Sequence, residues 1–144
     1  MIVGKTYTQN YTSDETVHHI AYSYDGTYWE KSLDVGVAKS EDDLGYDGSS
    51  ICYCNKWWIF IPSRPLKTET GMQSIICTKD PTSSLLNSSQ DVDPMKWNVI
   101  EDAFFGFTEK SGMAAGVMSV SDSKFIVVSE NYQKRESKIA FFEA

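Results

Sequence analysis

Cysteine and histidine, the residues that most often build metal and redox sites, are scarce in this sequence. It has three cysteines and two histidines in 144 residues, with no Cys-x-x-Cys pair and no spacing typical of zinc. Cys52 and Cys54 share one face of a strand, and we expect both, with Cys77, to be buried apolar side chains. His18 and His19 are adjacent, so a strand points them to opposite faces. The sequence therefore predicts no metal site and no cofactor.

Other absences exclude whole classes of partner. The net charge is −7 and the longest basic cluster is Lys134-Arg135, so the basic patch that nucleic-acid binding requires is missing. No apolar run approaches the roughly 20 residues that span a bilayer, so membrane insertion is not expected. The odd cysteine count, and the lack of a signal-peptide apolar region in MIVGKTYTQN, favour the cytoplasm or a virion.

Residues that favour strands dominate what is present. No segment carries a helical apolar stripe. The chain is long enough to fold without disulfide bonds or a structural metal. The predicted strands are Ile2–Thr8, His18–Tyr24, Tyr28–Lys31, Ser50–Cys54, Trp57–Pro62, Gln73–Thr78, Trp97–Ile100, Ala115–Val120, Lys124–Ser129 and Lys138–Phe142. The sequence thus predicts a single all-β domain over residues 1–144, with two long loops at 33–47 and 80–95 where function usually lies.

Two kinds of hairpin recur along the chain. DGSSICYCNKWWIFIPS (47–63) and AAGVMSVSDSKFIVVSE (114–130) both run from small residues through a polar turn into an aromatic-led strand, which makes Trp58 and Phe125 equivalent, 67 residues apart. IAYSYDGTYWE (20–30) matches IICTKDP and MKWNVIE (75–81 and 95–101), and KIAFFEA begins a further copy. Four antiparallel strands per repeat is the pattern of β-propeller blades, of which we count about two and a half.

The turn in the first of these segments resembles the Asp-box of sialidase-like propellers. We expect Asp25-Gly26 to form a hairpin turn, since glycine takes φ > 0 without steric cost. The resemblance implies that Asp25 and Ser23 bond the backbone of their own turn and that Trp29 packs between blades. Thr78-x-Asp80 matches this turn, so Asp80 is predicted to have the same structural role as Ser23, Asp25, Gly26 and Trp29.

The run from Trp57 to Ser63 resembles a strand of the five-bladed furanosidase propellers. In that family a carboxylate precedes the first strand of successive blades, and Asp47 and Glu109 match that placement. The resemblance implies Glu109 as general acid and Asp47 as a second carboxylate in glycoside cleavage. The chain lacks the family's first-blade aspartate, and TEKSGM departs from its usual Glu-Gly-Pro. The alternative reading is that both are ordinary surface carboxylates.

Three functions remain open at this stage. The favoured one is a module that binds a glycan or cell-surface polysaccharide, since propeller fragments with Asp-box turns resemble parts of phage tail and receptor-binding proteins. Aromatic faces stack on sugars, and the candidate ligand-binding residues are Tyr11, Tyr46, Trp57 and Trp97, with core packing as the alternative for each tryptophan. The second function is a glycoside hydrolase, or a remnant of one, that uses Glu109. The third is a purely structural assembly role.

The repeat count predicts association. Two and a half blades are too few to close a propeller, and open sheets leave unpaired edges that must be covered. The chain is therefore expected to belong to a larger assembly, to complete a ring with copies of itself, or to form a smaller open sandwich. We expect a homo-oligomer or a partner chain.

Overall fold

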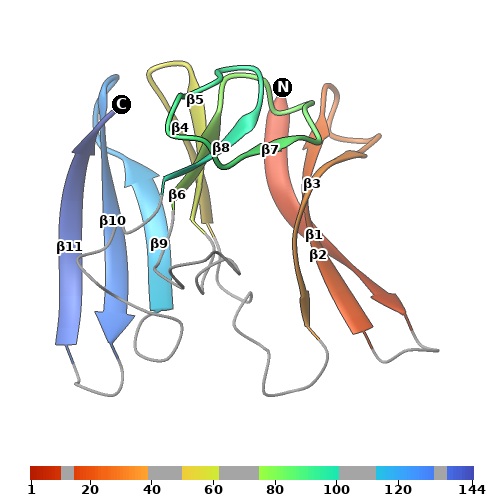
Figure 1. Ribbon diagram of the computed structural model, residues 1–144, viewed down its shortest axis with the longest axis horizontal. Helices are drawn as coiled ribbons and strands as arrows, with labels where there is room; N and C mark the ends of the chain where they lie inside the picture. Colours follow the sequence, from red (N-terminus) through yellow and green to blue (C-terminus); the bar gives the residue numbers. More distant parts are fainter. Residues whose placement is uncertain (11–14, 39–49, 62–74, 101–112, 132–135) are drawn as a thin grey trace.

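The expectation of an all-β chain is confirmed. The computed structural model describes residues 1–10, 15–38, 50–61, 75–100, 113–131 and 136–144, and these residues form three sheets (Figure 1). The N-terminal sheet contains β1 (Ile2–Asn10), β2 (Glu15–Ser23) and β3 (Glu30–Ala38), in that order. The C-terminal sheet contains β9 (Met113–Ser119), β10 (Lys124–Asn131) and β11 (Glu136–Glu143), with β10 in the middle.

The central sheet has five strands in the order β4-β5-β6-β8-β7. They are β4 (Ser50–Cys54), β5 (Trp57–Ile61), β6 (Ile75–Thr78), β7 (Leu86–Asn87) and β8 (Trp97–Ile100). All pairs are antiparallel except β7 with β8. The described sheets thus have three, five and three strands, where four-stranded blades were predicted, and the described residues form no closed propeller.

The sheets stack as three layers with the central sheet in the middle (Figure 1). Along β5 the side chains alternate between the two sides. Ile59 and Ile61 join a buried cluster with Val117, Phe125 and Val127 of the C-terminal sheet. On the other side, the buried cluster lies against the N-terminal sheet and consists of Ile20, Leu33, Phe60, Ile76 and Trp97. Burial on both faces explains why WWIFI is an uninterrupted apolar run.

The predicted repeat between the central and C-terminal sheets agrees with the strand register. Ile59 pairs with Cys77 as Ile126 pairs with Phe141. Trp58 pairs with Thr78 as Phe125 pairs with Phe142, so Trp58 and Phe125 hold the same place in their sheets, as the sequence predicted. β4, β5 and β6 therefore correspond to β9, β10 and β11.

Several predicted strand bounds are wrong by one to three residues, and two further errors concern β3. The strand expected at Tyr28–Lys31 begins at Glu30, because residues 24–29 are held in a turn longer than a two-residue hairpin loop. Residues 33–38, expected in a loop, continue β3. The short strand β7 lies within the predicted loop 80–95 and adds a parallel edge to the central sheet.

Candidate functional site

The turn between β2 and β3 is held by its own side chains. One carboxylate oxygen of Asp25 accepts hydrogen bonds from the backbone N–H groups of Thr27 (2.7 Å) and Tyr28 (3.0 Å), which lower the pKa of that carboxyl. The Ser23 hydroxyl donates to Asp25 (3.1 Å) and accepts from the Gly26 N–H (2.9 Å). Gly26 has a φ of 80°, which glycine adopts without a Cβ penalty. The geometry is that of a self-bonded structural turn.

A second turn after β6 repeats this arrangement. The Thr78 hydroxyl accepts from the Asp80 N–H (3.0 Å), as Ser23 does from its turn. The Asp80 carboxylate accepts from the N–H of Thr82 (3.0 Å) and from its hydroxyl (2.6 Å). Among the described residues, the hydrogen bonds of the Asp80 carboxylate therefore lie within its own turn.

The tryptophans that follow the two turns differ in burial. Trp97 is fully buried, and its indole N–H donates to the Ser32 hydroxyl (2.9 Å) and the Ser83 carbonyl (3.0 Å). Trp29 is 48% exposed, donates to the Gly26 carbonyl (3.2 Å) and lies over Gly4. Trp97, a predicted ligand-binding residue, therefore packs between sheets and has no ring face open to a ligand.

These turns and the tips of the β4–β5 and β9–β10 hairpins gather at one end of the molecule, the upper end in Figure 1. We call residues 24–29, 55–56, 79–96 and 121–123 the turn end. Tyr24, Tyr28 and Tyr53 are all exposed at or next to it. The turn end is thus rich in accessible aromatic rings.

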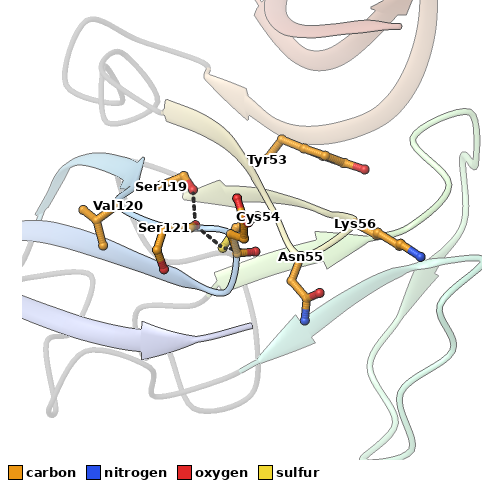
Figure 2. A pocket seen from close by; sticks show the side chains of 8 residues that line it. Tyr53, Cys54, Asn55, Lys56, Ser119, Val120 and Ser121 are labelled. Atoms are coloured by element: carbon orange, nitrogen blue, oxygen red, sulfur yellow. Dashed lines mark hydrogen bonds between the residues drawn. The ribbon is translucent and has the colours of Figure 1, made fainter.

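A polar hollow of about 510 Å³ lies between the β4–β5 and β9–β10 tips (Figure 2). It is lined by Tyr53, Cys54, Asn55, Lys56, Ser119, Val120, Ser121 and Asp122. Asn55 and Lys56 both have positive φ, 49° and 65°, which a two-residue hairpin turn of this hand requires. The tight turn therefore projects both side chains from the tip.

Several polar groups of the hollow have no partner within the part of the chain that the structure describes. Neither the Lys56 ammonium, the Asp122 carboxylate nor the Tyr53 hydroxyl makes a hydrogen bond or ion pair there. Asn55 donates to the Ala144 carbonyl at 2.6 Å, which leaves its side-chain oxygen as an acceptor. A cation, a carboxylate and an amide are thus available to an incoming ligand.

The walls of the hollow are fixed by contacts between the two sheets. The Cys54 thiol faces the carbonyls of Ser121 and Asp122, each at 3.7 Å, and the Ser119 hydroxyl donates to the Ser121 carbonyl at 3.0 Å (Figure 2). Figure 2 also shows the Tyr53 ring on the other side of β4 from Ser119, where it lies 4.8 Å from the Trp58 ring. Tyr53 therefore borders the hollow rather than forming its floor.

Trp57, another predicted ligand-binding residue, lines a different hollow. This apolar space of about 360 Å³ lies between the central and C-terminal sheets and includes Ile59, Cys77, Phe125 and Phe142. The Lys79 ammonium lies 4.9 Å above the Trp57 ring, so a cation already covers that ring. The lining suits apolar packing more than it suits a sugar.

The cysteines lie among apolar side chains. Cys54 and Cys77 are buried, and Cys52 packs partly buried beside them. Burial raises the pKa of the Cys52 and Cys77 thiols to about 11. Thiols that stay protonated at neutral pH are poor nucleophiles and metal ligands. Among the described residues, no group of three or more potential ligands is placed to hold a metal ion.

Four of the predicted site residues lie outside the described part of the chain. They are Tyr11, Tyr46, Asp47 and Glu109. Lys56 and Asp122 line the hollow and were not singled out from the sequence, where they are ordinary charged residues in turns. The signal that could have found them is the alignment of the two hairpins, which places their tips at equivalent positions.

Comparisons with models of protein families, with curated proteins and with solved structures found no match. The described residues also include no helix with the length and hydropathy of a membrane span.

Proposed function

We propose that this chain is a carbohydrate-binding module of propeller type, and that the turn end binds the sugar through the polar hollow. The observation that carries the proposal is the hollow of about 510 Å³ whose Lys56 and Asp122 charges have no partner among the described residues. Sugar hydroxyls both donate and accept, so a cation, a carboxylate and an amide oxygen around one hollow suit them.

The exposed aromatic rings support the same ligand class. Tyr53 borders the hollow with about half its surface open, and Tyr24 and Tyr28 are still more exposed. An aromatic ring offers an apolar face with a polar hydroxyl at its edge, which fits the C–H face and the hydroxyl rim of a sugar ring. The repeated Asp25 and Asp80 turns support the propeller assignment, and the hollow lies between two neighbouring sheets.

The test is retention of the purified chain on immobilised arabinans, fructans and bacterial cell-wall glycans, with released sugar measured in the same assay. We expect retention on at least one glycan without release. The double variant Lys56→Ala, Asp122→Ala is expected to weaken binding by about tenfold or more, since each lost charged hydrogen bond is worth roughly 1.5–3 kcal/mol. Glu136→Ala, an exposed carboxylate at the start of β11 and outside the turn end, is the control.

The two other functions give different results in that assay. Sugar release that Glu109→Gln abolishes would make the chain a glycoside hydrolase. If the chain is not retained on any glycan and releases no sugar, the sugar-binding proposal is refuted and an assembly role is left. The exposed apolar face of the C-terminal sheet makes that role the second candidate.

A further inference from the structure

The outer face of the C-terminal sheet is apolar and open. Met118 (58% exposed), Ile126 and Phe141 (79% exposed) stand side by side on β9, β10 and β11, since Ile126 pairs with both of the others. Val128 pairs with Ile139, which is 60% exposed, and extends the patch along the strands. A contiguous apolar patch on a sheet face marks an interaction surface.

The repeat indicates what covers such a face. Met118, Ile126 and Phe141 correspond by register to Cys52, Ile59 and Cys77 of the central sheet. Those three residues pack against the inner face of the C-terminal sheet, through Phe125, Val127 and Phe142. The outer face of the C-terminal sheet thus corresponds to the face of the central sheet that carries Cys52, Ile59 and Cys77. In the central sheet, this face is covered by another sheet.

The N-terminal sheet also has an outer face, on the side away from the central sheet. Ile20 and Val3 point toward the central sheet, so Ile2, Gly4 and Ala21 lie on the opposite, outer face.

The register also relates that outer face to a face that is already covered. With the Ser23 and Thr78 turns aligned, the pairs Ile2–Ser23 and Gly4–Ala21 correspond to Trp58–Thr78 and Phe60–Ile76 of the central sheet. The two pairs of the central sheet correspond in the C-terminal sheet to Phe125–Phe142 and Val127–Ala140, which cover the central sheet. Ile2 and Trp29, each 48% exposed, are the open apolar residues there.

We propose that the outer face of the C-terminal sheet binds the outer face of the N-terminal sheet of a second copy of this chain. The contact is head-to-tail, because the two faces differ, and such contacts either close into a ring or continue as a filament. The described residues of one chain form three sheets, so those of two copies contribute six. The resulting six lie within the range of about four to eight blades that close propellers. The assembly is therefore a closed dimer.

The test is the native mass in solution, measured by light scattering after size exclusion over a range of concentration. We expect twice the 16.2 kDa of one chain for the wild type. Phe141→Glu and Ile2→Glu each place a charge on one of the two faces and are both expected to reduce the mass to that of one chain. Leu85→Glu changes an apolar residue of the turn end whose exposure, 58%, lies between those of Ile2 and Phe141, and it should leave the dimer intact.

Two results would overturn the proposal. One is a single-chain mass for the wild type at the highest concentration. The other is an Ile2→Glu variant that stays dimeric while Phe141→Glu does not, because that pattern means two C-terminal sheets face each other. Far-ultraviolet circular dichroism checks that each variant is folded. A photo-reactive phenylalanine at position 141 supplies a second reading: cross-links to the peptide holding Ile2 support the proposal, and cross-links only to the C-terminal sheet contradict it.

Discussion

The indole N–H of Trp97 donates a hydrogen bond to the hydroxyl of Ser32, 65 residues earlier in the chain and in a different sheet. The Ser32 hydroxyl in turn donates to the Ser83 carbonyl at 2.9 Å. Trp97 therefore connects the N-terminal sheet, the central sheet and the long loop after the Asp80 turn. The equivalent Trp29 makes no such bond between sheets, because it lies on an outer face.

The first prediction concerns this connection. Trp97→Phe keeps a ring in the core but removes the donor to Ser32 and Ser83, and it leaves a small cavity. We expect the free energy of unfolding to fall by about 1–3 kcal/mol. Trp29→Phe should cost less than about 1 kcal/mol, because water can replace a bond made at the surface. Urea titrations of both variants measure the difference, and equal losses would contradict the inter-sheet role of Trp97.

The second prediction concerns the pH dependence of the Asp25 turn. Hydrogen bonds from Tyr28 and Thr27 lower the pKa of Asp25 in the folded chain. A lowered pKa adds stability that is present above the unfolded value of about 3.9 and is lost as the pH falls through the folded value. We therefore expect the melting temperature of the wild type to exceed that of Asp25→Asn by several degrees at pH 7.

The difference in melting temperature between the wild type and Asp25→Asn should narrow below about pH 4, since the aspartate then becomes protonated. The two proteins share all other carboxyl groups, so their difference isolates Asp25. A gap that stays constant from pH 7 to acid would show that the charge of Asp25 does not contribute to the turn.

The third prediction concerns Tyr22 at alkaline pH. Its hydroxyl donates to Glu30 at 2.6 Å, and this bond, with burial, raises the pKa of Tyr22 to about 12. A raised pKa adds stability that is present below the unfolded value of about 10 and is lost as the pH rises through about 12. In an absorbance titration of the tyrosines, Tyr22→Phe should remove the ionisation with the highest pKa. Glu30→Gln should lower the pKa of that ionisation toward about 10. An unchanged titration in both variants would refute the bond.

The fourth prediction separates the core from the surface. Phe60 is fully buried between the N-terminal and central sheets, and Leu85 is mostly exposed in the turn end. Phe60→Ala is expected to lower the free energy of unfolding by about 3–5 kcal/mol through lost burial and a cavity. Leu85→Ala should change it by less than about 0.5 kcal/mol. Denaturant unfolding compares the two, and a small loss at Phe60 would mean that the sheets do not share this core.

Much of the strand pattern could be predicted from the sequence. Ser50–Cys54 and Trp97–Ile100 are observed with the predicted bounds, because turn residues or a loop flank each apolar run. Tyr28 and Trp29 were misplaced because the Asp25 carboxylate accepts hydrogen bonds from the backbone of the turn, which overrides their preference for strands. β7 was missed because a two-residue parallel pair has no periodic signal.

The candidate site was less predictable. The aromatic character of Trp57 and Trp97 was visible, but which face of the sheet each occupies depends on register and on the neighbouring sheet. The run KFIVVSE is apolar on both faces, as WWIFI is, and in the central sheet this pattern accompanies burial on both sides. The sequence could not show that one of these faces is open on β10. Lys56 and Asp122 line one hollow only because the tips of two hairpins lie side by side, which the sequence does not show.

The most direct test of sugar binding at the turn end is a nuclear magnetic resonance titration of the labelled chain with oligosaccharide fragments of whichever glycan retains it. We expect the largest shifts at the amides of Asn55, Lys56, Ser121 and Asp122, and the variant Lys56→Ala, Asp122→Ala should need about tenfold or more oligosaccharide to reach the same shifts. Shifts confined to other parts of the chain, or no shifts with any glycan, would contradict the account.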